Sequence, residues 1–157
     1  MKYLRRIREK RITDIYKIYE RAIKFVDEQF KENKFAAMMV QASLIEEITK
    51  HLLILKYVSE IKLDTEEEPE ETDKKIDRVN ENSFARNINL AHTLKCISLS
   101  IKKNLNDYRE IRNETIHEAF YTTIKSKEIK KLICKGNKLI DYLSKKIFLL
   151  NNRTFKE

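Results

Sequence analysis

The sequence predicts an all-α protein, built as an antiparallel bundle of four to five helices. Its 157 residues include one glycine, one proline and no tryptophan. Strand-rich folds need more turn residues than this, and the abundance of Lys, Glu, Ile and Leu favours helices. A chain of this length is expected to form one domain with a hydrophobic core, which we place over residues 1–157.

The first half of the chain predicts two long helices. One covers about residues 4–31 and the other about residues 34–61, because apolar residues recur in both at the spacing of one helix face. The stripe of the second helix is wide, and it consists of Phe35, Met38, Met39, Ala42, Ile45, Thr49, Leu52 and Leu53. Glu46 lies near this stripe. It either reaches water at the edge or pairs with an arginine from another helix, such as Arg112, since an unpaired buried carboxylate is costly.

An acidic segment interrupts this pattern at residues 63–82. Within it, residues 64–73 hold seven acidic residues and no basic one. Because like charges repel and the segment has little apolar surface to bury, we expect a flexible loop inserted between helices.

The second half of the chain predicts two or three further helices. A third helix is expected to begin at the N-cap Ser83 and to break at residues 104–107, where Asp107 and Glu110 resemble a capping box for a short fourth helix. A second joint is expected at residues 122–126, before a last helix that ends near Leu150. The inward residues of that last helix are expected to be Ile129, Leu132, Ile133, Leu139, Ile140, Leu143 and Ile147.

The net charge of +8 is unevenly distributed. Residues 1–11 contain six bases and one acid, and residues 125–157 contain ten bases and three acids. Basic ends of this kind indicate a surface that attracts nucleic acid. The alternative is a lysine-rich helical protein whose charges are simply solvated.

Several classes of protein are disfavoured. No apolar run is long enough to cross a membrane, and the charged N-terminus is not followed by the apolar segment of a signal peptide. Cys96 and Cys134 fit no metal or redox spacing, so both are expected to be reduced and buried. We therefore expect a cytoplasmic protein without a membrane partner, a metal or a cofactor.

The six residues from Arg112 to His117 carry the most specific chemistry in the chain. Arginine can clamp phosphate oxygens with two hydrogen bonds, histidine exchanges protons near neutral pH, and Asn113 offers both a donor and an acceptor. Asn113 and His117 share one helical face. Arg112 lies about 140° from His117 around an ideal helix, so its long side chain has to swing towards the histidine, or the helix has to begin or distort there.

This RNxxxH pattern, in a helical bundle after a long amphipathic helix with Glu46, resembles the HEPN superfamily (higher eukaryotes and prokaryotes nucleotide-binding domains). The segment ASLIEEITKHLL also looks like the second helix of that family, and the resemblance covers residues 13–150. It implies a metal-independent endoribonuclease, often a toxin or antiviral defence effector, that works on RNA as a homodimer. His117 would be the general acid or base, Arg112 would stabilise the scissile phosphate and Asn113 would orient the site or contact the substrate.

The resemblance also bears on partners and on two tyrosines. An antitoxin or another regulatory protein is a possible partner. In the subgroup whose antitoxin is a small nucleotidyltransferase, a tyrosine lies two residues after the histidine, whereas this chain has Ala119 there and Tyr121 two residues later. Tyr121 and Tyr108 either line the cleft or pack in the core.

Two other functions have some support in the sequence. Glu114 and His117 have the ExxH spacing of di-iron bundles, but neither His51 nor His92 has a glutamate three residues earlier, so the second half of such a site is missing. The stronger alternative is a non-catalytic nucleotide- or protein-binding module, an antitoxin or adaptor. In that protein Arg112 would pair structurally with Glu46.

Overall fold

The protein is described by a computed structural model over residues 12–60, 69–119 and 126–154. In these ranges the chain forms six helices and no strand, which confirms the predicted all-α bundle. The helices are α2 (Ile12–Glu32), α3 (Lys34–Glu60), α4 (Pro69–Glu81), α5 (Phe84–Thr93), α6 (Leu99–Ala119) and α7 (Ser126–Thr154). The predicted start of the first helix, at residues 4–11, lies outside the described residues.

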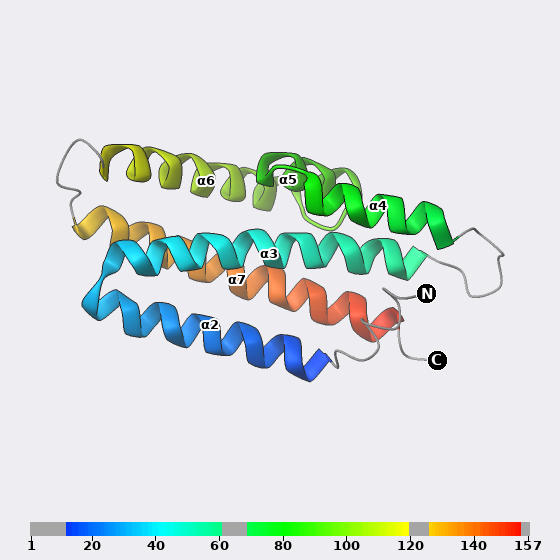
Figure 1. The fold of residues 1–157 in the computed structure, drawn as a ribbon, viewed down its shortest axis with the longest axis horizontal. Coiled ribbons are helices and arrows are strands. Elements are labelled where there is room, and N and C mark those ends of the chain that lie inside the picture. Colours follow the sequence, from blue (N-terminus) through cyan, green and yellow to red (C-terminus); the bar gives the residue numbers. More distant parts are fainter. Residues whose placement is uncertain (1–11, 61–68, 120–125, 155–157) are drawn as a thin grey trace.

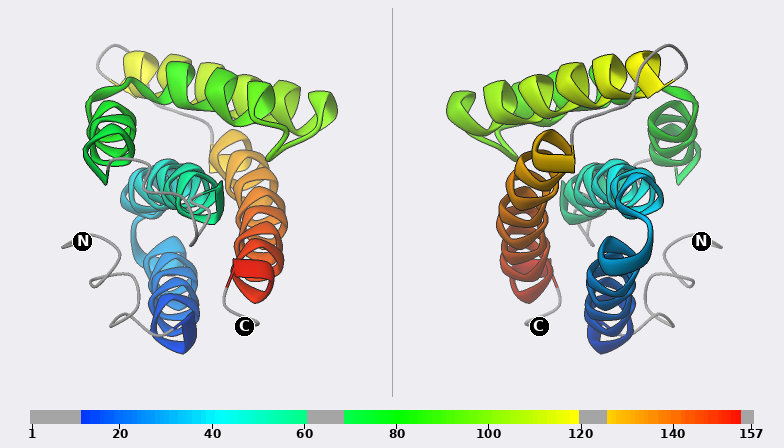
Figure 2. Two further views of the ribbon diagram at one scale, coloured as in Figure 1. Left: turned by 90° about the vertical axis from the view of Figure 1, so that its right-hand side faces the viewer. Right: turned by 90° about the vertical axis from the view of Figure 1, so that its left-hand side faces the viewer.

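Helix α3 is the centre of the bundle. It packs most extensively against α7 and α2 and also touches α4, α5 and α6. Figures 1 and 2 show α2 and α7 on either side of it, with α4 to α6 lying over one side and α6 crossing obliquely. A helix surrounded in this way has to be apolar around most of its circumference, and 13 of its residues are buried. Met39, expected in its stripe, is instead 39% exposed.

The prediction of a loop over residues 63–82 is wrong from Pro69 onward, because α4 occupies most of that segment. Proline suits the first position of a helix, and carboxylates in the first turn interact favourably with the helix dipole. Ile76 and Val79 are fully buried and give α4 an apolar edge against α3. Two ion pairs at the i,i+4 spacing also offset the negative charge, and these are Glu70–Lys74 and Glu71–Lys75. Residues 63–68 lie outside the described part.

The break predicted at residues 104–107 is also misplaced, because it lies between α5 and α6. Lys95 has a positive φ of 57°, and the amide of Cys96 donates to the carbonyl of Ala91 at 2.9 Å. This left-handed residue with a backward hydrogen bond ends α5 in the manner of a Schellman motif. The hydroxyl of Ser98 then accepts from the amide of Ile101 at 3.3 Å and caps α6. The proposed capping box at Asp107 falls inside α6.

Two other predicted helix starts are confirmed, whereas the last helix continues to Thr154, beyond its predicted end near Leu150. Ser83 is the N-cap of α5, where its hydroxyl accepts from the amide of Arg86. The last helix begins at Ser126, and all seven of its predicted inward residues are buried. Both cysteines are free, but only Cys96 is buried, whereas Cys134 is exposed on α7.

Candidate functional site

The motif from Arg112 to His117 lies in the last two turns of α6, not at the start of a short helix as the sequence suggested. Arg112 is half-buried, while Asn113 and His117 are exposed. The Nε and Nη2 atoms of Arg112 donate to Oδ1 of Asn113 at 3.1 and 2.8 Å. The neighbouring amide therefore holds one edge of the guanidinium on the surface of α6.

Tyr108, one turn before Arg112, belongs to the core. Its side chain is 0% exposed, and its hydroxyl donates to Oε1 of Gln41 at 3.0 Å. Burial raises the pKa of Tyr108, and the positive charge of Arg112 offsets a part of that rise. Of the two readings of this tyrosine, packing is the one that the contacts support.

Gln41 connects three helices in the interior and fixes the position of α6. It lies on α3 with 0% exposure, accepts from Tyr108 of α6, and donates through Nε2 to the carbonyl of Ile133 at 2.9 Å and to Oδ1 of Asn137 at 2.6 Å on α7. The chain's single glycine, Gly136, makes room for this side chain, because a Cβ atom there would overlap Gln41. This network was not predicted from the sequence, in which its visible signal is a polar residue within the apolar stripe of α3.

Glu46 lies at the edge of the α3 stripe and reaches solvent. Its side chain is 30% exposed and lies 3.8 Å from the ammonium group of Lys50 on the same helix. The alternative pairing with Arg112 does not form, since the guanidinium binds Asn113 instead. Tyr121, the remaining predicted site residue, lies outside the described residues.

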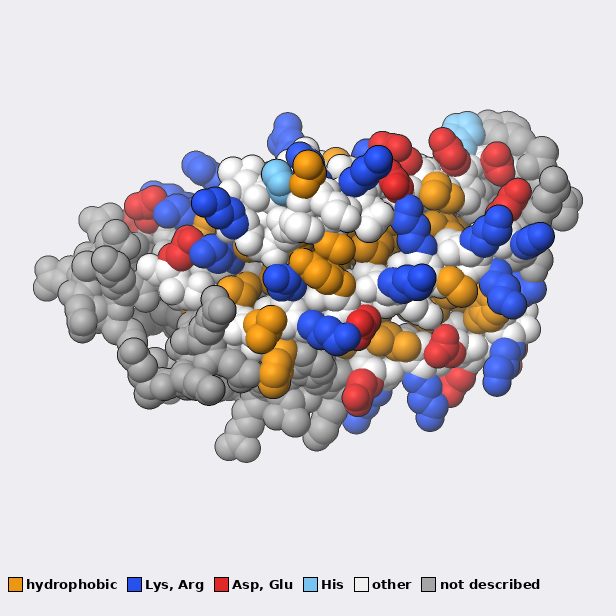
Figure 3. Space-filling view, turned by 180° about the vertical axis from the view of Figure 1, so that it is seen from behind, with side chains coloured by type: hydrophobic (Ala, Val, Ile, Leu, Met, Phe, Trp, Pro, Cys, Tyr) orange, Lys and Arg blue, Asp and Glu red, His pale blue; other side chains and the backbone are white. Residues whose placement is uncertain are grey.

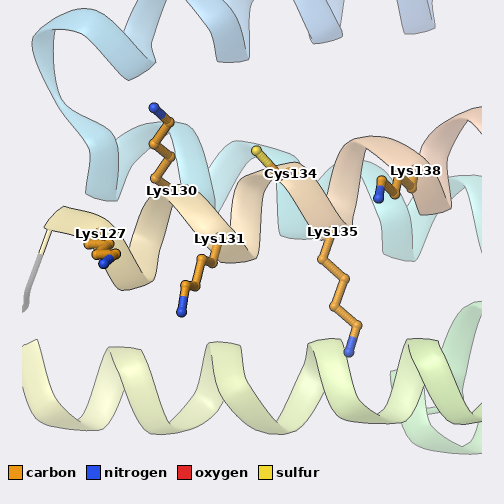
Figure 4. Close-up of a pocket in the computed structure, with 6 residues that line it drawn as sticks. All are labelled: Lys127, Lys130, Lys131, Cys134, Lys135 and Lys138. Carbon is orange, nitrogen blue, oxygen red and sulfur yellow. The ribbon is translucent and has the colours of Figure 1, made fainter.

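A row of lysines on α7 runs beside the motif. Lys127, Lys130, Lys131, Lys135 and Lys138, here called the lysine face, line a shallow open depression together with Cys134 (Figure 4). Figure 3 views the molecule from the side of α7 and shows Lys and Arg side chains spread over this face, with acidic side chains among them. The sequence indicated a basic C-terminal segment but not that its lysines share a face.

The register of α6 and α7 brings the lysine face level with the motif. In the view of Figure 1 the two helices run in opposite directions, although α6 crosses α7 obliquely (Figure 2), and Lys135 contacts Asp107 at 3.4 Å. From that pair Arg112 lies five residues on along α6 and Lys131 four residues back along α7. At 1.5 Å per residue these steps are about 7.5 and 6 Å, and both lead towards the same end of the bundle. Lys131 also points from α7 towards α6 (Figure 4).

Over the described residues, no group of three or more His, Cys, Asp or Glu side chains could hold a metal ion. Within that same part of the chain, no helix combines the length and apolar character needed to cross a membrane. His51, considered as a ligand at first, is half-buried and hydrogen-bonded to the hydroxyl of Tyr19 at 2.8 Å.

No protein-family model, curated protein or solved structure matches this chain. Its function therefore has to be inferred from the chemistry of the residues described above.

Proposed function

We propose that the protein is a metal-independent endoribonuclease of the HEPN type, a toxin or antiviral defence effector that acts as a homodimer. The observation that carries this proposal is the presence of the half-buried Arg112 and the exposed Asn113 and His117 on the surface of the last two turns of α6. A purely structural role predicts dry contacts between these side chains and the protein interior. Exposure instead leaves them accessible to a phosphate in solution.

The proposed reaction needs only a base, an acid and a cation. One imidazole of His117 removes the proton of a ribose 2′-hydroxyl, and the 2′-oxygen attacks the adjacent phosphorus. The bond from phosphorus to the 5′-oxygen breaks, and the 5′-oxygen takes a proton from the second subunit's imidazole. The products are a 2′,3′-cyclic phosphate and a 5′-hydroxyl. Arg112 stabilises the charge that develops on the phosphate oxygens.

The hydrogen bonds of Arg112 fit this role. A guanidinium has five N–H donors, and Asn113 Oδ1 accepts from only two of the three nitrogens. The remaining donors are left for a phosphate, while the amide restricts the rotation of the side chain. Such preorganisation lowers the entropy lost when the group engages its substrate.

The homodimer is part of the proposal because one copy presents the motif on a convex helix surface. A cleft needs an opposing wall, and a second α6 related by two-fold symmetry would supply one. Ile111, next to Arg112, is 40% exposed, and Leu99 on the same helix is 68% exposed. Burial of such side chains between two copies would favour association.

A second candidate is the non-catalytic binding module. Acidic residues on α6 favour it, because they surround the motif and would oppose a phosphate there. These residues are Asp107, Glu110, Glu114 and Glu118. In that protein Arg112 and Asn113 would hold the surface of α6 in shape for a nucleotide or a partner protein.

A cleavage assay decides between the two. Mixed cellular RNA is incubated with EDTA and with the parent protein, His117→Ala or His92→Ala, a control histidine on α5. We expect cyclic phosphate ends from the parent and from the control variant, and none from His117→Ala, with circular dichroism and size-exclusion profiles unchanged. Cleavage by His117→Ala at the parent rate would refute the role of that histidine. Failure of all three proteins to cleave would favour the binding module.

A further inference from the structure

The lysine face is a regular array along one side of α7. Lys127, Lys131, Lys135 and Lys138 recur at intervals of three or four residues, which keeps them on one side of the helix, and Lys130 lies at the edge of that side next to Lys131. The first and last are 11 residues apart, so the array extends over about 16 Å. Four of the five side chains are exposed and Lys135 is half-buried.

The positive charge of this face is poorly balanced. Lys135 pairs with Asp107, but the other four lysines form no ion pair with any described residue. Elsewhere on the surface, lysines such as Lys74 and Lys145 pair with the acid four residues before them. The segment 126–138 contains five lysines and one glutamate, a formal charge of +4. Like charges held this close repel one another, so an anionic ligand would be stabilising.

We infer that the lysine face binds the sugar–phosphate backbone of the RNA strand that is cleaved at Arg112 and His117. The inference rests on the proposed function for the identity of its ligand. Because Lys135 contacts Asp107 on α6 and Lys131 points towards α6 (Figure 4), a strand bound along α7 would lie beside the helix that carries the motif. The lysines then compensate for the acidic residues of α6, which alone would repel a phosphate.

The chemistry of the face indicates the mode of binding. Lysine ammonium groups are point charges on flexible stems, which suit phosphate contacts that carry no sequence information. The face includes no aromatic side chain on which a base could stack. Binding to an anionic membrane surface would need an apolar face that could insert, but the apolar residues between these lysines, Ile129, Leu132 and Ile133, are buried, and the exposed Phe148 and Leu149 of α7 lie at least ten residues beyond Lys138.

The first test measures binding without cleavage. Full-length His117→Ala protein is titrated into a fluorescein-labelled single-stranded RNA, and anisotropy is followed over a range of salt concentrations. Four to five phosphate contacts predict a slope of log affinity against log salt of about −3. Adding Lys130→Gln and Lys131→Gln should lower the affinity about tenfold or more and reduce the slope by about 1.4. The matched control adds Lys74→Gln and Lys145→Gln, which remove the same charge elsewhere and should leave both values nearly unchanged.

The second test uses the protein's own cysteines as footprinting probes. Cys134 is exposed in the middle of the lysine face, whereas Cys96 is buried and burial raises its pKa to about 11. In the same His117→Ala protein, bound RNA should slow alkylation of Cys134 by iodoacetamide and leave the slow reaction of Cys96 unchanged. Anionic lipid vesicles serve as the competing ligand.

The outcomes separate the two proposals. Cleavage by the parent protein without protection of Cys134 would overturn the lysine face as the RNA site and leave the ribonuclease intact. Protection and a lysine-dependent salt slope without cleavage would support the face and favour the binding module. Protection by vesicles but not by RNA would overturn the inference in favour of a membrane surface.

Discussion

Replacing Gly136 by alanine sets helix propensity against packing, and the structure predicts which effect wins. Alanine in the interior of an exposed helix is more favourable than glycine by about 1 kcal/mol. At this position, however, a Cβ atom would overlap the side-chain amide of Gln41, with Nε2 at 2.8 Å and Cδ and Oε1 closer still. Under 3.0 Å something has to shift, and Gln41 is fully buried.

The magnitude follows from the hydrogen bonds that Gln41 would give up. It bonds with Tyr108, Ile133 and Asn137, and a hydrogen bond contributes about 1 kcal/mol net. A loss of about 3 kcal/mol against a gain of about 1 kcal/mol predicts that Gly136→Ala destabilises the protein by about 2 kcal/mol. For a chain of this size, the melting temperature should fall by about 4–8 °C.

The assay is thermal and urea unfolding followed by circular dichroism, applied as a double-mutant cycle with Gln41→Ala. Once the glutamine side chain is gone, Gly136→Ala should stabilise the protein by about 1 kcal/mol, the helix-propensity term alone. The sign of the alanine effect therefore reverses between the two backgrounds. A melting temperature at or above that of the parent for Gly136→Ala alone would refute the reasoning. So would an equal loss of stability in the Gln41→Ala background.

Two further predictions concern a helix cap and a buried hydroxyl. Ser83→Ala removes the acceptor for the amide of Arg86 and should cost about 1 kcal/mol in urea unfolding, whereas Ser100→Ala in α6 should be neutral or stabilising, and equal effects would contradict the capping role. Tyr108→Phe leaves Oε1 of Gln41 unpaired and destabilises the protein below pH 10. Burial raises the pKa of Tyr108 above its ordinary value of 10.0, so the stability linked to its proton is complete below that pH and is lost as the pH rises further. The difference in unfolding free energy between the parent and Tyr108→Phe should therefore shrink by about 1.4 kcal/mol at pH 11 relative to pH 8, and a constant difference would contradict this assignment.

The spacing and type of residues along the chain were sufficient to predict its longest helices. The wide apolar stripe of α3 and the inward residues of α7 follow from helical spacing alone, and the cap at Ser83 follows from residue type. The α5–α6 boundary was not predicted because Lys95 adopts a left-handed conformation that favours glycine. The sequence has no glycine or asparagine at that position to indicate the end of a helix. Helix α4 was missed because charge density outweighed the weaker signals of Pro69, the i,i+4 pairs and two apolar residues.

In the candidate site, too, the sequence determined some features and the tertiary structure determined others. The sequence by itself determined that Arg112, Asn113 and His117 share about two helical turns, because that depends only on spacing along a helix. Only the tertiary structure decided that Tyr108 lies in the core and that the guanidinium binds Asn113 and not Glu46. It also decided that the lysine face lies level with the motif, since the Asp107–Lys135 pair and the Gln41 network set how α6 packs on α7. Contacts between residues distant in sequence depend on how helix faces fit together, and the period of a single helix carries no information about that fit.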